Sequence, residues 1–321
     1  DPYTSYYTPD EFKKLMESLN GRYSGIGLSV QASKEGYIKA VSVFDNSPAK
    51  EAGIEPGDYI TKVNGKGYGA SQLEEAVAEI KGEPGTEVTL TILRTEEGKT
   101  DSKEFDIKVS RADVNVDTID DDILEIRDKK IGYIHIKAFD DITWQDFSDS
   151  YSKLMAQDID GLVLDVRNNP GGALDVVINI ADNFLDEGVI VTTKDKNGKE
   201  VVEKSDASAS DIPMVILQNE NSASASEILA GAMKDRGRAK VIGTQSFGKG
   251  VVQKVFNLEN GAGAKITISE YFTPNGTQIN KVGVTPDIEV SSDEDLDLSK
   301  MDFKNDKQFV TALNELLKEL E

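Results

Sequence analysis

Two short apolar runs, each followed by small residues and then by a helical pattern, constrain the fold of this chain most strongly. The runs occupy residues 161–166 and 213–218, and the helical patterns occupy residues 173–185 and 226–236. Uninterrupted apolar residues over so few positions predict strands buried on both faces, as in parallel sheets covered by helices. The sequence therefore predicts an α/β core over about residues 112–290.

The composition narrows the function before any motif is considered. The chain has 321 residues, which suits two domains or a core with an accessory module. Its 36 Lys and Arg residues against 58 Asp and Glu residues give a formal charge of −22. Nucleic acid and anionic membrane surfaces are therefore poor partners, because each would be repelled. The absence of Cys excludes disulfides, thiol catalysis and cysteine metal sites.

Both ends of the chain are predicted to be helical. Thr8, Pro9 and Glu11 form a capping-box start, and apolar residues at helical spacing follow over residues 12–19. A second amphipathic helix is predicted from residue 306, after an acidic stretch. These apolar faces suit packing on the chain's own core and association between copies equally well.

Residues 24–111 follow a different sequence pattern, in which short predicted strands are separated by glycine and proline. Strand patterns occupy residues 25–30, 37–43, 57–65 and 87–94, and helical patterns occupy residues 47–53 and 72–80. This block resembles a PDZ domain, with Ser24-Gly25-Ile26-Gly27 at the position of the loop that binds a terminal carboxylate. Further matches are Ser47-Pro48-Ala49, Ala52-Gly53-Ile54, Gly57-Asp58 and Val63-Asn64-Gly65. The resemblance implies binding of peptide C-termini by strand addition, although such a domain can also serve as a spacer.

Three predicted loop-to-helix junctions could carry chemistry. In residues 165–172, Gly171 and Gly172 would expose backbone N–H groups to an anion, unless they only connect a strand to a helix. In residues 219–227, small residues would leave a nucleophilic serine accessible, with the Ala225 N–H as an oxyanion donor. These serines could equally be simple N-caps.

The third junction, residues 245–253, places Lys249 between two glycines and Gln253 four residues later. A lysine acts as a general base only when neutral, and burial lowers its pKa towards working pH. Taken alone, Lys249 also fits a solvated loop lysine. The single histidine, His135, lies in a strand pattern and would have to serve any Ser–His–Asp triad, which we regard as the weaker hypothesis.

Together these segments resemble the C-terminal processing peptidases, the tail-specific serine proteases of family S41 that also carry a PDZ domain. The matches are residues 165–172, residues 222–228, and residues 247–250 with Gln253. Residues 276–287 resemble the closing segment of that family, so the resemblance extends over about residues 10–290. It implies that Ser224 is the nucleophile, Lys249 the general base and Gln253 the residue that orients the lysine. The oxyanion hole would combine the N–H of Ala225 with that of Gly172 or Gly171, and we favour Gly172.

The resemblance also implies an architecture. We expect an N-terminal helical segment at 1–22, a PDZ domain at 23–111, a serine peptidase core at 112–290 and an acidic, then helical, segment at 291–321. The core is expected to be a mixed sheet with flanking helices, in crotonase-like or ClpP-like strand–helix units, with the PDZ domain inserted.

The function implied is an endopeptidase that cleaves proteins at or near unstructured C-terminal tails. One alternative is a catalytically silent scaffold that binds peptides through the PDZ domain. Another is an acyl-transfer enzyme of the crotonase type, against which the PDZ domain argues.

The remaining expectations concern cofactors, partners and location. The resemblance implies no metal or organic cofactor, and its partners would be peptide C-termini, an activating adaptor or lipoprotein, and further copies of the chain. The chain begins at Asp1 without a leader pattern, so we expect a form from which a signal or anchor was removed. By resemblance, the protein is expected outside the cytoplasm.

Overall fold

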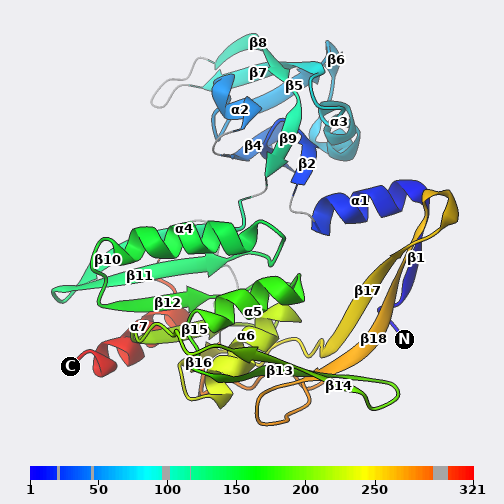
Figure 1. The fold of residues 1–321 in the computed structure, drawn as a ribbon. Helices are drawn as coiled ribbons and strands as arrows, with labels where there is room; N and C mark the ends of the chain where they lie inside the picture. Colours follow the sequence, from blue (N-terminus) through cyan, green and yellow to red (C-terminus); the bar gives the residue numbers. More distant parts are fainter. Residues whose placement is uncertain (20–21, 45–46, 96–101, 116, 292–302) are drawn as a thin grey trace. The chain divides into compact units, whose positions relative to one another are not determined.

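The computed structural model describes residues 1–19, 22–44, 47–95, 102–115, 117–291 and 303–321 (Figure 1). The chain forms two compact units. The core unit combines Asp1–Asn20 with Thr118–Glu321, and the inserted unit is Gly21–Asp117. Over the described residues, no helix combines the length and apolar composition that a membrane crossing requires.

A six-stranded mixed sheet forms the centre of the core unit. Its two apolar strands, β12 (Gly161–Asp165) and β15 (Met214–Gln218), are parallel neighbours, as predicted. Only β10 runs antiparallel to its neighbour; the other pairings are parallel. In spatial order the strands are β10 (Ile119–Ile126), β11 (Lys129–Ile136), β12, β15, β16 (Lys240–Gly243) and β19 (Ile288–Glu289).

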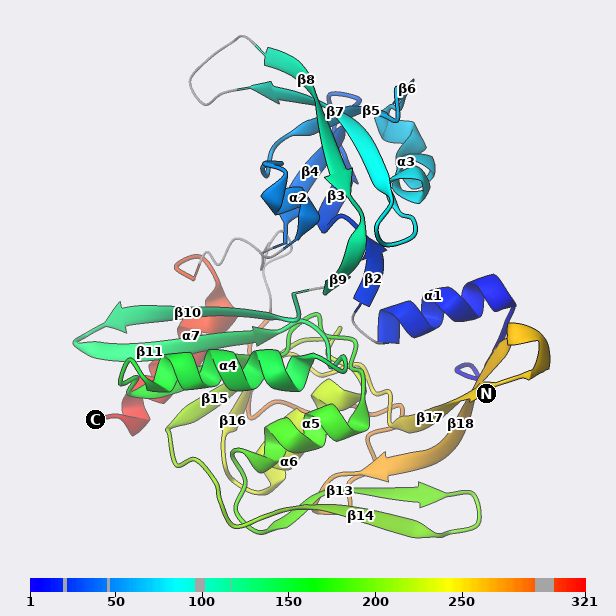
Figure 2. The same ribbon diagram turned by 45° about the horizontal axis from the view of Figure 1, so that its top comes forward.

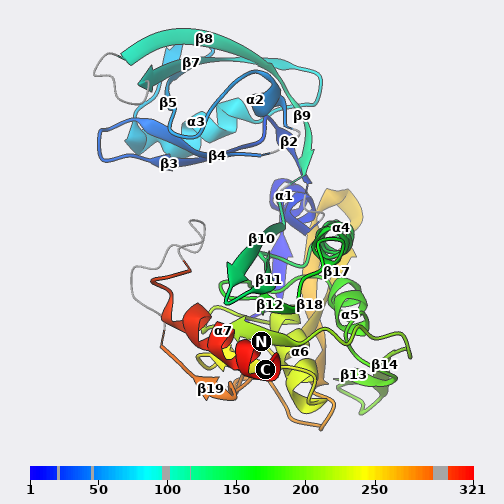
Figure 3. The same ribbon diagram turned by 90° about the vertical axis from the view of Figure 1, so that its left-hand side faces the viewer.

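Helices cover both faces of this sheet (Figure 3). One face carries α4 (Thr143–Met155), α5 (Leu174–Asp182) and α6 (Ala225–Asp235), and the other carries α7 (Lys307–Glu319). Within β12, Leu162 and Leu164 belong to the first apolar cluster, whereas Val163 packs with Phe309 of α7. Because both faces are covered by helices, the strand has the uninterrupted apolar sequence that predicted it. The apolar face of α7 is thereby used inside its own unit.

Buried charges fasten α7 to the end of β12. Arg167 is 2% exposed, and its guanidinium binds the carboxylates of Asp165 and Asp306, the latter at 2.7 Å. Asp306 is also the N-cap of α7 and accepts the Phe309 N–H at 3.0 Å. Burial alone would raise the pKa of Asp165, but Arg167 outweighs it and holds that pKa below its ordinary value. The Asp and Arg of the 165–172 segment are therefore bound into the structure around α7.

A second sheet of the core unit contains a long hairpin (Figure 2). The hairpin consists of β17 (Val251–Asn257) and β18 (Gly263–Phe272). Three further strands complete the sheet: β1 (Ser5–Tyr7) and β13 (Gly188–Asp195) pair with β18, and β14 (Glu200–Ser205) pairs with β13. The helix α1 (Pro9–Leu19) packs near the hairpin turn, where a Cβ on Gly263 would lie 1.9 Å from the Phe12 ring. The Thr8 N–H donates to Glu11 at 2.9 Å, which confirms the predicted helix start.

The third junction is a correction to the sequence prediction. Residues 245–253 lead into the strand β17 and not into a helix, so Gln253 lies on a strand. The strands β10, β13 and β14 were also not predicted. Each is exposed on part of its length and carries charged residues, which obscures the apolar alternation by which half-buried strands are recognised.

The inserted unit is a small β-sheet domain around one apolar core. Its strands and helices are β2 (Arg22–Gly25), β3 (Leu28–Ala32), β4 (Ile38–Val43), α2 (Pro48–Glu51), β5 (Tyr59–Val63), β6 (Lys66–Gly67), η1 (Ala70–Gln72), α3 (Leu73–Ile80), β7 (Glu87–Thr95), β8 (Ser102–Ser110) and β9 (Ala112–Asn115). The strand predicted over residues 25–30 is interrupted at Gly27, whose φ is +81°. A Cβ at Gly27 would lie 2.2 Å from Ser47 Cβ, so only glycine allows this approach.

Candidate active site

The loops that follow β12 and β15 lie against one another because these strands are parallel neighbours. The Ala223 N–H donates to the Asn169 carbonyl at 3.0 Å, and the Ser226 hydroxyl donates to the same oxygen at 2.9 Å. A Cβ on Gly171 would lie only 2.6 Å from Ser224 Cβ. The first two predicted junctions are thus brought into direct contact.

Ser224 differs from the two other serines of its segment. The hydroxyls of Ser222 and Ser226 are buried and donate to carbonyl oxygens of the neighbouring loop. Ser224 lines a cavity of about 430 Å³ and has φ +56°, an uncommon conformation for a residue other than glycine. Such local strain is typical of functional residues, and a sharp strand-to-helix turn is how several hydrolases expose a nucleophile. The geometry distinguishes Ser224 on grounds independent of the family pattern.

Lys249 lines the same cavity and is half-buried. Burial lowers the pKa of its ammonium group, the nearby Lys265 lowers it further, and Glu227 opposes both effects. The net pKa lies below the ordinary value of 10.5. The amine also lies 5.7 Å from the centre of the Tyr3 ring. Ser224 and a lysine with a lowered pKa therefore line one cavity, and a lowered pKa is what a lysine needs to act as a general base.

One buried carboxylate joins the serine and lysine loops. Glu227 is fully buried, and its Oε2 accepts the N–H groups of Ser224 at 2.8 Å and Lys249 at 2.9 Å. Its Oε1 accepts the Ser246 hydroxyl at 2.6 Å and the Gly248 N–H at 2.7 Å. A single side chain therefore fixes the backbone on which both candidate catalytic residues are carried.

Tyr271 of β18 makes a second connection between these loops. Its hydroxyl lies within hydrogen-bond distance of the carbonyl oxygens of Ser224, at 2.9 Å, and of Lys249. Burial raises the pKa of this phenol well above its ordinary value, so it remains a proton donor. Sequence reasoning missed both Glu227 and Tyr271. Glu227 stands three residues after Ser224, but nothing in the sequence shows that its side chain turns back to the Lys249 loop.

Gly171 and Gly172 differ in whether their backbone N–H groups are already hydrogen-bonded. The Gly171 N–H is already used, because it donates to the Asn169 side chain at 2.8 Å. The N–H groups of Gly172 and Ala225 have no hydrogen-bond partner within the part of the chain that the structure describes. These two free donors, and not that of Gly171, are available to a developing oxyanion.

Gly171→Ala is expected to lower hydrolytic activity by at least about 10²-fold, because a displacement of the order of 1 Å at a reacting centre has that effect. The residue has φ +102°, and the added methyl would collide with Ser224 Cβ and with the Ala223 carbonyl at 2.7 Å. The measurement is kcat/KM on a peptide together with a thermal melt. Gly198→Ala is the matched control, since it also has positive φ, +81°, but its Cβ would meet only Lys194 Cε at 3.9 Å. Equal activity of both variants would contradict this close approach.

The side chain of Gln253 makes a different contact from the one expected. Its side-chain nitrogen donates to the backbone carbonyl of Tyr3, so the N-terminal segment holds it in place. Its side chain lines the cavity together with Lys249. Its orientation of the lysine stays a prediction.

His135 lies in β11, and its Nε2 is 3.1 Å from the Arg167 carbonyl. Its Nδ1 is 3.7 Å from the Asp120 carboxylate. Burial alone lowers the pKa of His135, but Asp120 and other neighbours raise it overall. Its contacts tie it to the Arg167 loop, and it is not among the residues lining the Ser224 cavity.

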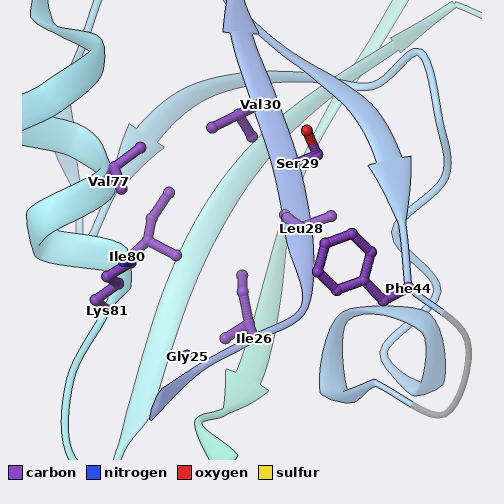
Figure 4. Close-up of a pocket in the computed structure, with 9 residues that line it drawn as sticks. All are labelled: Gly25, Ile26, Leu28, Ser29, Val30, Phe44, Val77, Ile80 and Lys81. Carbon is purple, nitrogen blue, oxygen red and sulfur yellow. The ribbon is translucent and has the colours of Figure 1, made fainter. Parts of the chain in front are cut away.

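A separate groove lies in the inserted unit, between β3 and α3 (Figure 4). Its volume is about 270 Å³, and it is mostly apolar. Gly25 and Ile26 of the predicted carboxylate loop line it, whereas the Ser24 hydroxyl donates to Asp113 at 2.8 Å. Gly27 follows in the turn that enters β3. The remaining lining residues are Leu28, Ser29, Val30, Phe44, Val77, Ile80 and Lys81.

Comparison with known proteins gives matches over nearly the whole chain. The model of peptidase family S41 matches residues 130–290, and a PDZ domain model matches residues 40–94. The carboxy-terminal-processing protease of Bartonella bacilliformis is 40% identical over 305 residues, which cover 90% of this chain and 66% of that protein. The carboxyl-terminal-processing protease of Picosynechococcus is 37% identical over 318 residues, 98% of this chain and 75% of that protein. The chain thus spans about two thirds to three quarters of the length of these relatives.

Among solved structures, the photosystem II D1 C-terminal processing protease is similar, with 28% sequence identity and a TM-score of 0.56. The similarity covers 91% of this chain and 78% of that one. The predicted fold class, an α/β peptidase core with an inserted PDZ domain, is confirmed.

Proposed function

The chain belongs to peptidase family S41, and we propose that it carries the catalytic machinery of a serine endopeptidase. The supporting observation is that Ser224 and the half-buried Lys249 line one cavity while the Glu227 carboxylate holds the backbone of both. The alternative, a silent peptide-binding scaffold, has no comparable support, since the relatives named above are proteases.

In the proposed reaction, neutral Lys249 accepts the proton of the Ser224 hydroxyl as Oγ bonds to the scissile carbonyl carbon. The N–H groups of Gly172 and Ala225 donate to the resulting oxyanion. When the C–N bond breaks, Lys249 passes its proton to the leaving amine. It then takes a proton from the water that attacks the acyl-enzyme, and returns that proton to Ser224 as the acid is released.

We assign to Gln253 the role of orienting the Lys249 side chain. Its nitrogen is already bound to the Tyr3 carbonyl, which fixes the amide plane and leaves the amide oxygen as the acceptor for the lysine amine. The N-terminal segment would thereby support the catalytic centre through Gln253.

The substrates are proposed to be proteins with unstructured C-terminal tails. A PDZ domain and a peptidase core in one chain fit protein or peptide substrates. The groove between β3 and α3 would hold the terminal residues, with the backbone of residues 24–27 at the carboxylate. We also propose an extracytoplasmic location, activation by an adaptor or lipoprotein, and association with further copies of the chain.

Digestion of an unstructured reporter protein tests this function. Reporters with a free and with an amidated C-terminus are incubated with the chain and with Ser224→Ala. We expect cleavage by the unmodified chain and none by Ser224→Ala, with the free-tail reporter cleaved faster. Equal rates on both reporters would remove recognition of the terminal carboxylate. Cleavage that persists in Ser224→Ala would remove the serine mechanism.

A further inference from the structure

Lys265 is a cation inside the candidate active site to which no role has yet been given. It lies on β18, is half-buried, and lines the same cavity as Ser224 and Lys249. Within the described residues, it forms no ion pair with a carboxylate.

Strand register fixes the side on which Lys265 lies. It is directly opposite Val255 of β17 and Ser5 of β1. Val255 and Gln253 also line the cavity, so this face of the hairpin forms one wall of it. Lys254 and its partner Ile266 alternate onto the other face and are exposed.

The charges around Lys265 leave it suited to an anion. The neighbouring cation is Lys249, and the positive charge of Lys265 lowers the pKa of Lys249 and so favours its neutral form. The carboxylate of Glu227 is occupied by four donors, as described above. Asp141, the acidic residue among those lining the cavity, is exposed and comes from the loop after Phe139. A half-buried ammonium group with no acid bound to it is stabilised when a ligand brings a carboxylate.

We propose that Lys265 forms a subsite for a carboxylate of the bound peptide, close to the scissile bond and separate from the groove of the inserted unit. The proposal rests on the proposed peptidase function. Val255 lies two residues beyond Gln253, so the subsite is about 7 Å further along the strand, or about two residues of an extended peptide. The carboxylate can come from an acidic side chain or from a chain end near the cleaved bond.

The test uses matched peptides cleaved by the full chain. In one series, a single Asp or Asn is moved through the three positions on each side of the cleaved bond, with the C-terminus amidated. In the other series, a free or amidated C-terminus is placed one to four residues after that bond. We expect kcat/KM to favour the acidic member of at least one pair by about ten- to a hundredfold, as a charge-assisted hydrogen bond would give.

Lys265→Met is expected to bring that ratio to about one, whereas Lys254→Met, on the same hairpin but the opposite face, leaves it unchanged. The ratio matters because Lys265→Met also changes the pKa of Lys249, which alters the rates on both peptides together. Lys265→Glu should reverse the preference towards Lys in place of Asp. Thermal melts of the variants show whether each remains folded.

Two results would overturn the subsite: no acidic preference at any position, or a preference that survives in Lys265→Met. Failure of the peptidase function is seen separately, as absence of Ser224-dependent cleavage of every peptide. In that case the same ratios are measured as dissociation constants of the peptides from Ser224→Ala, which needs no turnover. Loss of the acidic preference in Ser224→Ala/Lys265→Met then supports the subsite, and its retention contradicts it.

Discussion

Lys249→Met is expected to lower kcat/KM for a peptide substrate by about 10²–10⁴-fold, the range typical of removing a general base. Methionine keeps most of the length of the side chain, so the cavity wall is retained. The pKa of Lys249 is lowered, which means that the folded state disfavours its charged form. Below that lowered pKa the residue therefore costs stability, and the cost disappears as pH rises towards 10.5. The melt of Lys249→Met at neutral pH should accordingly not fall.

Lys249→Arg distinguishes two possible roles of Lys249, that of a general base and that of a permanent positive charge. Arginine keeps the positive charge but cannot become neutral at working pH, so the account predicts that it is as inactive as Met. In the unmodified chain, activity should rise with pH through a single ionisation below 10.5, because the neutral amine is the reactive form. Activity retained by Lys249→Arg, or falling as pH rises through this range, would show that the amine is not the base.

Glu227→Gln is expected to reduce activity by about 10²-fold or more, through displacement of both reacting groups. Each carboxylate oxygen accepts two donors, so an amide NH₂ in either orientation faces an N–H group that has lost its acceptor. Each donor left unpaired in this buried place costs about 1–3 kcal/mol, so the free energy of unfolding should fall as well. Glu220→Gln is the control, since Glu220 is exposed and, among the described residues, accepts only the Thr244 hydroxyl, at 2.8 Å.

The pH profile distinguishes positioning of Lys249 from simple loss of stability. The Glu227 charge raises the pKa of Lys249, so Glu227→Gln should lower that pKa further. The residual activity is therefore expected to begin at lower pH than in the unmodified chain. A reduced rate with an unmoved profile would mean that Glu227 acts on the fold alone.

The apolar runs predicted β12 and β15, and their parallel pairing explains why the loops after them meet. The sequence motifs indicated Ser224, Lys249 and the glycine pair as candidate site residues, because these residues lie within short, ordered segments. Sequence alone could not distinguish Gly171 from Gly172, because only the structure shows that the Gly171 N–H is already bound to the Asn169 side chain.

The rest of the site depends on contacts between distant segments. Tyr3 reaches Lys249 through the pairing of β1 with β18, and Tyr271 comes from the far end of β18. In the sequence, Lys265 resembles an ordinary exposed residue of a strand. Its register with Val255 shows that it lies on the cavity wall. Such neighbours follow from tertiary pairing, for which a single sequence carries no local pattern.

Trapping the acyl-enzyme and locating the acyl group tests directly whether Ser224 is the nucleophile. The chain is mixed with an activated ester of a short peptide, quenched in acid within the first turnover, and digested for mass spectrometry. The account predicts one acyl group on Ser224, absent from Ser224→Ala and greatly reduced in Lys249→Met. An acyl group on another residue, or turnover of the ester with no adduct on Ser224, would contradict it.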